Sequence, residues 1–140
     1  ANAGVDESNS EPGTVITLPN DPDASARKIG RTLEDRFGVQ IGIVITDTFG
    51  RPWRLGQVNV AIGLYRVPAI TSEVGTKDAW GRDLSVTEAA LCDELAAASG
   101  LLIKKAAKTP IVLFRGLKWT IEEKTSALNI LRSNSEDMFR

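Results

Sequence analysis

The sequence predicts a single domain built from both α-helices and β-strands. Two stretches carry apolar residues at three- and four-residue spacing, which is typical of amphipathic helices, and several short runs of β-branched apolar residues are typical of strands. These elements alternate only loosely, and the glycine signatures of the Rossmann and Walker nucleotide-binding folds are absent. A chain of 140 residues is long enough for one domain with its own core but not clearly for two.

The N-terminal third is expected to contain a short strand, a helix and a buried strand. Residues 14–18 are mostly β-branched and lie between turn-forming segments, which favours a short strand. Asp21 is the expected N-cap of a helix over residues 22–37, whose first residue is a proline and whose apolar residues recur every three or four positions. Gly38 is the expected C-terminal cap. The apolar, β-branched residues 39–46 then predict a buried strand.

The remainder of the chain begins with a predicted loop over residues 47–57, which contains a proline and two glycines. Residues 84–102 give the clearest helical pattern, and Asp83 is its expected cap. Within this helix, Asp93 and Glu94 are expected on a solvated or dimer-facing side. The other expected elements are, in order, a strand over residues 58–64, a weakly periodic loop over 71–80, a basic loop ending at Pro110, a short buried strand over 111–114, and helical turns near 124–131 and 134–139.

The composition excludes several classes of binding partner and catalytic group. The net charge is −1, so nonspecific binding to nucleic acid is not expected, and no apolar run approaches the ~20 residues of a membrane helix. The single Cys92 excludes an internal disulfide and fits a reducing compartment, and a signal peptide of the usual kind is not apparent, so we expect a cytoplasmic protein. Because the chain has 0 histidines, His-based catalysis and His-ligated zinc are excluded, and any metal must be bound through oxygen.

The most informative motif runs from Asp47 to Arg54. An apolar strand leads directly into Asp47 and Thr48, whose oxygens suit a hard divalent cation, and Arg51 and Arg54 follow, which can hold phosphate or carboxylate in bidentate fashion. A simpler alternative is that Asp47 only satisfies backbone groups in a turn. Two arginines around a proline are costly to hold together without an anion, which favours the site. Trp53 is expected to pack against the protein rather than to stack on a base.

Several residues outside this motif are candidates for the site only in combination with it. Asp6 and Asn9 read singly as turn residues, but Asp6 together with Asp47 would give one divalent ion two carboxylates, with water and phosphate oxygens completing the shell. A basic cluster follows the long helix and contains Lys104, Lys105 and Lys108. These lysines either complement the dipole of a solvated helix end or contact nucleotide phosphates, and spacing alone does not decide between the two.

The chain as a whole resembles coenzyme F420:L-glutamate ligases. The resemblance covers nearly the whole chain, in the order that the family has. The segments that carry it are Asn2 to Asp6 with Ser8-Asn9, Pro22 to Ala26, Ile45 to Arg54, Ala61-Ile62-Gly63, Gly81 to Leu84 with Val86-Thr87, Ala90 to Ala98, Arg115-Gly116 and Glu136 to Arg140.

The resemblance implies an α+β fold with a mixed sheet, flanking helices and an intertwined homodimer. It also implies a reaction in which GTP phosphorylates the terminal carboxylate of a deazaflavin coenzyme precursor and the amino group of L-glutamate attacks the acyl phosphate. Two divalent ions, magnesium or manganese, would assist. By the family motif, Asp6 and Asp47 are metal ligands, Thr48 binds the second ion and Asn9 contacts the nucleotide. A catalytic role for Arg51 and Arg54 in holding an anion is inferred from their charge and position.

The chain departs from the family pattern in three places. The family has a further N-terminal half, so residues 1–140 correspond to its C-terminal portion, and a longer precursor or a separate N-terminal chain is expected to supply the rest. We predict that the portion alone is inactive. The family's Met-Gly-Glu or Met-Gly-Lys loop corresponds here to residues 103–106, which include Lys104 and Lys105 but no glycine. Asp83 stands where glutamate is usual.

Two alternatives to this ligase remain at the level of sequence. The altered loop at Lys104 and Lys105 would suit a non-catalytic relative that binds a nucleotide or another anion, or that serves as an assembly subunit. The chain would also suit a ligase acting on a different carboxylate, because nothing in the sequence itself specifies the deazaflavin.

Overall fold

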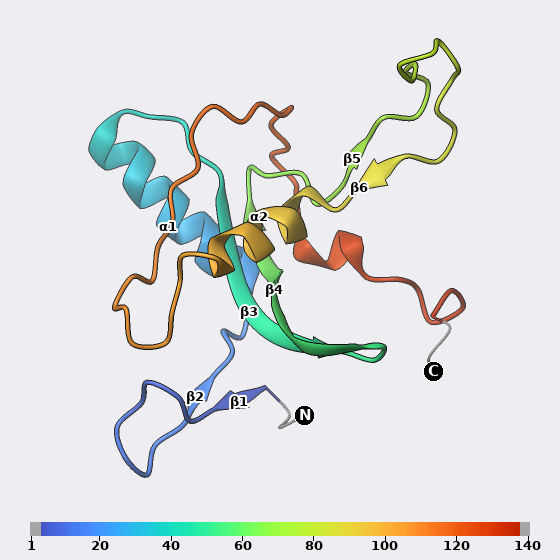
Figure 1. The fold of residues 1–140 in the computed structure, drawn as a ribbon. Helices are drawn as coiled ribbons and strands as arrows, with labels where there is room; N and C mark the ends of the chain where they lie inside the picture. Colours follow the sequence, from blue (N-terminus) through green and yellow to red (C-terminus); the bar gives the residue numbers. More distant parts are fainter. Residues whose placement is uncertain (1–3, 138–140) are drawn as a thin grey trace.

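A computed structural model describes residues 4–137, and its helices and strands confirm an α+β fold (Figure 1). Where a mixed sheet was expected, the described strands form antiparallel pairs, which are β1 with β2, β3 with β4 and β5 with β6. The elements are β1 (Val5–Asp6), β2 (Ile16–Thr17), α1 (Pro22–Phe37), β3 (Ile43–Arg51), β4 (Arg54–Tyr65), β5 (Thr71–Ser72), β6 (Glu88–Ala89), α2 (Leu91–Gly100) and the 3-10 helix η1 (Ala127–Ile130).

The centre of the fold is a long β-hairpin, and the predicted loop over residues 47–57 was wrong. β3 and β4 pair from Ile43 opposite Tyr65 to Arg51 opposite Arg54, so the loop shrinks to the two residues between the strands. The proline is tolerated because it lies in that turn, where its missing N–H removes no ladder hydrogen bond. The strand expected over residues 39–46 therefore starts later and extends further, and its residues are only partly buried.

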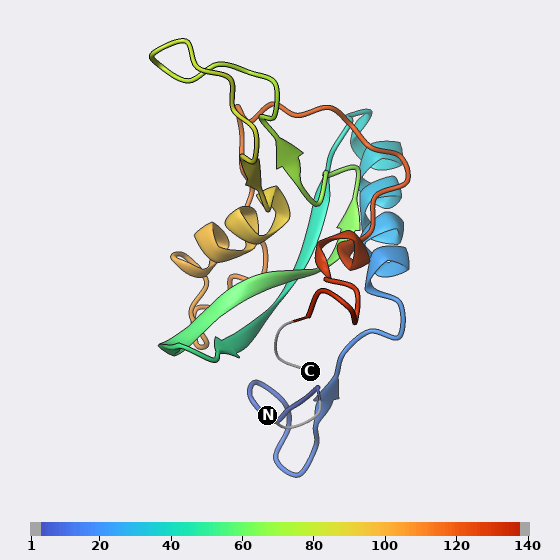
Figure 2. The same cartoon turned by 90° about the vertical axis from the view of Figure 1, so that its right-hand side faces the viewer.

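The helices cover opposite faces of this hairpin, as Figure 2 shows. Helix α1 was predicted with its correct bounds, because both of its caps are encoded locally: the Oδ1 atom of Asp21 accepts the N–H of Ala24 at 2.8 Å, and Gly38 has a φ of 62°. Gly63 in β4 has no room for a side chain, since a Cβ there would overlap the backbone of Pro22. This close approach holds the start of α1 against the sheet.

Helix α2 is shorter than predicted, because residues 84–90 are taken up by other hydrogen bonds. The backbone of Leu84 exchanges hydrogen bonds with Gly75 and Thr76, and β6 pairs with β5, so these residues form one side of an arm that projects from the body (Figures 1 and 2). Asp83 therefore does not cap α2. Its carboxylate instead forms an ion pair with Lys77 at 2.7 Å.

Asp93 does not lie on a solvated side, and its alternative placement on a dimer-facing side stays a prediction. Asp93 is half-buried, and its Oδ1 atom accepts the backbone N–H of Ala61 at 2.9 Å, which ties the first turn of α2 to β4. Ala61 pairs with Thr46 directly beside the bulge at which Ile62 has no partner in β3. Glu94 is exposed, in agreement with the expectation of a solvated side.

The C-terminal part is mostly irregular. The predicted buried strand over residues 111–114 is wrong: Ile111 is 80% exposed and Leu113 59%, and the segment pairs with no strand in the described part of the chain. An apolar run becomes a strand only where a partner satisfies its backbone. The helical turns near residues 124–131 are confirmed as η1, whereas the second predicted segment forms a turn at 134–136, and residues 138–140 lie outside the described range.

The core lies where the C-terminal half of β4 meets α2 and η1. Its members include Ala61, Leu64, Ala69, Cys92 and Ala127. Burial raises the pKa of the Cys92 thiol to about 11, and its Sγ donates to the carbonyl of Ala69, so this thiol is a packing group rather than a nucleophile. No helix in the described residues is both long and apolar enough to cross a membrane.

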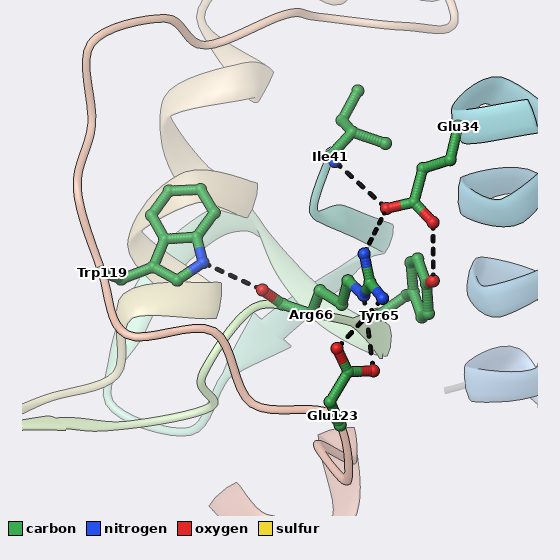
Figure 3. A network of polar contacts seen from close by, with 6 residues as sticks. All are labelled: Glu34, Ile41, Tyr65, Arg66, Trp119 and Glu123. Carbon is green, nitrogen blue, oxygen red and sulfur yellow. Dashed lines mark hydrogen bonds and ion pairs between the residues drawn. The ribbon is translucent and has the colours of Figure 1, made fainter. Parts of the chain in front are cut away.

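A polar network centred on Glu34 fastens α1 to the end of β4 (Figure 3). One carboxylate oxygen of Glu34 accepts from Arg66 at 2.7 Å and from the backbone N–H of Ile41 at 3.3 Å, and the other accepts the Tyr65 hydroxyl at 2.9 Å. Arg66 also pairs with Glu123 at 3.0 Å. Charge-assisted bonds of this kind fix the position of α1 more firmly than apolar contact alone.

The network also holds the segment that precedes η1. The indole N–H of Trp119 donates to the Arg66 carbonyl at 2.9 Å, as Figure 3 shows, and the Thr125 hydroxyl donates to the Val67 carbonyl at 2.6 Å. Arg66 adopts a φ of 55°, an unusual value for a residue with a side chain, which is maintained because both its backbone and its side chain are held.

Replacing Glu34 by glutamine is expected to lower the thermal midpoint at neutral pH, and the difference from wild type should vanish in acid. Partial burial of Glu34 raises its pKa, but hydrogen bonds from Tyr65, Ile41 and Arg66 outweigh it, so the pKa lies below the ordinary 4.5. A carboxyl with a lowered pKa stabilises the fold above its unfolded pKa, and that stability is lost as the pH falls through the folded value. Midpoints measured between pH 3 and 7 test this, with Asp35→Asn, an exposed position on the same helix, as the control.

Candidate functional site

A pocket of about 720 Å³ opens between the β3–β4 hairpin and the loop that follows α2. The hairpin contributes Thr46, Asp47, Thr48 and Asn59, and the loop contributes residues between 103 and 110. Side chains alternate along a strand, so Thr46, Thr48 and Asn59 share one face of the hairpin, with Asp47 between the two threonines along β3, whereas the loop is held by the end of α2. Strand and loop thus meet in one concave site.

Residues predicted from three separate segments come together at this pocket. Asn9 from the N-terminal turn, Asp47 and Thr48 from β3, and Lys104 and Lys105 from the loop all line it. Asn9 has a φ of 58°, a conformation that asparagine tolerates better than most residues. The geometry therefore unites an amide, a carboxylate and a hydroxyl with two ammonium groups.

Asn59 lines the pocket as well and was missed by the sequence analysis. It lies directly opposite Thr48 in the antiparallel ladder, so the two side chains project from the same face of the sheet. The predicted loop over residues 47–57 concealed this, because only a paired strand gives Asn59 a cross-strand neighbour. A polar asparagine within the apolar strand predicted over residues 58–64 was the available signal.

Among the described residues, the Asp47 carboxylate accepts one hydrogen bond, from the backbone N–H of Thr48 to its Oδ1 at 2.8 Å. This is the local backbone contact of the simpler alternative, but it uses only one oxygen. The other oxygen is available to a ligand in a pocket that Asp47 itself lines. The capping and binding interpretations of Asp47 are therefore compatible.

Asp6 lies beside the pocket and is connected to it through Lys105. Its carboxylate accepts the Ser8 hydroxyl at 2.6 Å and the Ser8 N–H at 2.8 Å, and the Nζ atom of Lys105 lies 3.4 Å from the carboxylate and 2.7 Å from the Ser8 hydroxyl oxygen. The hydrogen bonds from Ser8, opposed by partial desolvation and aided by Lys105, hold the pKa of Asp6 below its ordinary 3.8. Asp6 is thus ionised at neutral pH, as a metal ligand must be.

Arg51 and Arg54 are not among the residues that line the pocket. They face each other across the hairpin turn, where Nη2 of Arg51 donates to the Leu55 carbonyl at 3.4 Å. The Nε of Arg51 is buried, with no partner among the described residues, so a hydrogen-bond donor is left over at this turn. Trp53 does not pack as expected, because it is 81% exposed.

Comparison with known proteins places the chain in a family. A family model described as F420-0:Gamma-glutamyl ligase matches residues 1–116. The chain belongs to this family. It is 51% identical over 144 residues to the coenzyme F420:L-glutamate ligase of Methanopyrus kandleri, an alignment that covers 100% of the chain and 57% of the relative.

Two further relatives of the same name give similar figures. The protein of Methanosarcina mazei is 44% identical over 140 residues, covering 99% of the chain and 55% of the relative. That of Methanothermobacter thermautotrophicus is 42% identical over 142 residues, covering 100% of the chain and 56% of the relative. The chain therefore spans a little over half the length of these ligases.

The donor set suits the oxygen-loving cations that the family resemblance implies. Carboxylate, hydroxyl and amide oxygens from Asp47, Thr48 and Asn9 line the pocket, with Asp6 beside it, and such donors favour magnesium or manganese. The described residues contain no group of three or more acidic, histidine or cysteine side chains that could enclose a metal alone. A cation here would complete its shell with water and phosphate oxygens, as magnesium often does at phosphate sites.

The opposite wall of the pocket is basic. Lys104, Lys105 and Lys108 all contribute to it, and the loop continues into Thr109. A site with the acid Asp47 in its hairpin and ammonium groups in its loop suits a cation bridged to a polyphosphate, because each partner meets its opposite charge. Residues 103–106 contain no glycine, so an anion bound here would be held by these side chains rather than by a close approach of the backbone.

Proposed function

We propose that the chain forms the cation- and phosphate-binding portion of a GTP-dependent ligase that adds L-glutamate to a deazaflavin coenzyme precursor. The observation that carries the proposal is the pocket that Asp47, Thr48 and Asn9 line together with three lysines. Membership of the F420-0:gamma-glutamyl ligase family supports the reaction, and the names of the relatives support its acceptor and amino acid. The choice of GTP and the two-step course are parts of the proposal.

The proposed reaction proceeds through an acyl phosphate. A carboxylate oxygen of the precursor attacks the γ-phosphorus of GTP, and GDP leaves with the electrons of the broken P–O bond. The amino group of glutamate then attacks the acyl carbon, loses a proton, and expels inorganic phosphate, which leaves an amide. Both steps concentrate negative charge on phosphate oxygens, so their rates depend on nearby positive charge.

The pocket residues divide this task between them. Asp47 and Asp6 would hold a magnesium or manganese ion, with Thr48 directed to a second ion, and the bound metal would neutralise charge on the phosphates. Lys104, Lys105 and Lys108 are placed to bind phosphate oxygens from the other wall. By family resemblance, Asn9 contacts the nucleotide. We further propose that the protein acts as a homodimer in the cytoplasm.

Arg51 and Arg54 are proposed to bind an anionic group of the precursor at the hairpin turn. The segment from residue 49 to 57 contains these two positive charges and no acidic residue, and the buried Nε of Arg51 has no hydrogen-bond partner among residues 4–137. Replacing both by glutamine is expected to raise the KM for the precursor about 10- to 100-fold, since bonds to charged groups are lost. The KM for GTP should stay constant. The control Arg27→Gln, at an exposed position, should leave both KM values unchanged. Equal losses for both substrates would contradict the assignment.

The proposed function is tested by incubating the protein in its full natural length with GTP, L-glutamate, the precursor and manganese. Formation of the glutamylated product together with GDP and phosphate is expected. Transfer of ¹⁸O from the precursor carboxylate to phosphate would demonstrate the acyl phosphate, and its absence during turnover would exclude that intermediate. Residues 1–140 alone are expected to be inactive, and turnover by them would refute that expectation.

A non-catalytic relative that binds a nucleotide or another anion is the second candidate. It is favoured by one observation, which is that Lys105 is engaged with Asp6 and Ser8 rather than standing free in the pocket. Calorimetric titration with GTP and magnesium distinguishes the candidates. Binding without turnover in the full-length protein would support the relative, whereas no binding at all would favour an assembly role.

A further inference from the structure

Lys105 occupies a position that the proposed cation would also need. Its Nζ lies 3.4 Å from Oδ2 of Asp6 and 2.7 Å from the Ser8 hydroxyl oxygen, while the same lysine lines the pocket that contains Asp47. An ammonium group and a divalent cation at the same carboxylate repel each other. Binding of a cation to Asp6 therefore favours departure of Lys105.

The ion pair between Lys105 and Asp6 can break and re-form readily. The side chain of Lys105 is 69% exposed and that of Asp6 56%, so water screens the ion pair and the pair is weak. The lysine carries its charge on a flexible four-carbon stem, so it can leave Asp6 without moving the backbone. Lys104 and Lys108 line the same pocket, but in the described part of the chain the lysine that pairs with Asp6 is Lys105.

We infer that Lys105 exchanges between Asp6 and the phosphate groups of the nucleotide, and thereby couples cation binding to nucleotide binding. Without ligands, Lys105 neutralises Asp6 and competes with the cation. When a polyphosphate enters the pocket, Lys105 turns to its oxygens, which releases Asp6 for the cation. This inference rests on the proposed function, because it takes the pocket to bind both a divalent cation and a nucleotide.

The coupling is measurable without any turnover. The free Mn²⁺ signal in electron paramagnetic resonance gives the affinity of the full-length protein for manganese, with and without GDP. Lys105→Met is expected to bind manganese about two- to fivefold more tightly than wild type when no nucleotide is present, because the competing charge is gone. GDP should increase manganese affinity less in this variant than in wild type, and manganese should increase GDP affinity less by the same factor.

Matched variants separate this role from a general charge effect. Lys104→Met and Lys108→Met also remove one positive charge from the pocket wall, and each is expected to leave the manganese affinity without nucleotide close to that of wild type. Lys105→Arg keeps the charge and should behave like wild type in this measurement. Equal tightening by all three methionine variants, or no tightening by Lys105→Met, would overturn the exchange.

The results also separate this inference from the proposed function. If the wild-type protein binds manganese and GDP but Lys105→Met shows no change in coupling, only the role of Lys105 is wrong. If the wild-type protein binds neither manganese nor GDP, the proposed function of the pocket fails and the exchange fails with it. Circular dichroism of each variant verifies that a loss of binding is not a loss of fold.

Discussion

Replacing Asp47 by asparagine is expected to reduce glutamate ligation by at least about 100-fold and to weaken manganese binding in the same protein. In the proposed reaction, negative charge collects on the transferred phosphate, and the cation that offsets this charge depends on the Asp47 carboxylate. Asparagine keeps the shape of the side chain but loses the negative charge, so it offers the cation a much weaker ligand.

This substitution isolates the charge because the local structure offers asparagine the same hydrogen bond. The Oδ1 atom of Asp47 accepts the N–H of Thr48 at 2.8 Å, and the carbonyl oxygen of an asparagine can do the same. The hairpin is held by its strand ladder from Ile43 to Arg51, which the change does not touch. The thermal midpoint is therefore expected to stay near that of wild type.

The control for Asp47→Asn is an acid that is paired elsewhere. Asp83→Asn removes one negative charge from the projecting arm, where the carboxylate pairs with Lys77, and it should preserve both manganese binding and turnover. Turnover is measured as glutamylated product formed, at several manganese concentrations. Near-normal turnover by Asp47→Asn with normal manganese affinity would mean that Asp47 acts only as the turn acid of the simpler interpretation.

Helix α1 could be predicted to the residue because its determinants are local. The Asp21 side chain, the proline that follows it and Gly38 act within one helical turn of the residues they terminate. The candidate metal ligands could be proposed for a related reason, since Asp47 and Thr48 follow an apolar run directly. Their convergence with Asn9 required the resemblance to a family, because no local pattern brings residue 9 to β3.

What the sequence did not show was decided by partners distant in the chain. Residues 47–57 have the glycines and proline of a loop, yet pairing with β4 supplies a ladder that outweighs those signals. Residues 84–90 have a helical pattern, yet they pair with the other side of the arm instead. Asn59 became a pocket residue only once the register placed it opposite Thr48.

Among the substitutions proposed here, replacing Asp23 by alanine is expected to lower the free energy of unfolding most, by about 3 to 5 kcal/mol. A chain of this size does not readily tolerate such a loss. Asp23 lies in the first turn of α1 and connects three segments. Its Oδ1 atom accepts the backbone N–H of Leu64 at 2.7 Å and of Ala127 at 3.2 Å, and its Oδ2 atom accepts the Ser126 hydroxyl at 2.6 Å.

The large effect follows from what the substitution leaves behind. Leu64 is 1% exposed and Ala127 7%, so alanine at position 23 strands two buried N–H groups that water cannot easily reach. The loss of each buried partner costs more than the bond itself contributes. These partners are 41 and 104 residues away along the chain, so no local pattern in the sequence indicated them.

Urea unfolding of the full-length protein measures the effect of Asp23→Ala, and two further variants serve as controls. Asp23→Asn keeps a carbonyl oxygen for Leu64 and Ala127 and should recover most of the stability. Asp35→Ala, at an exposed position of the same helix, should change the unfolding free energy by less than about 0.5 kcal/mol. If Asp23→Ala cost no more than Asp35→Ala, water would have to replace the lost carboxylate, and α1 would not depend on Asp23 for its attachment to β4 and η1.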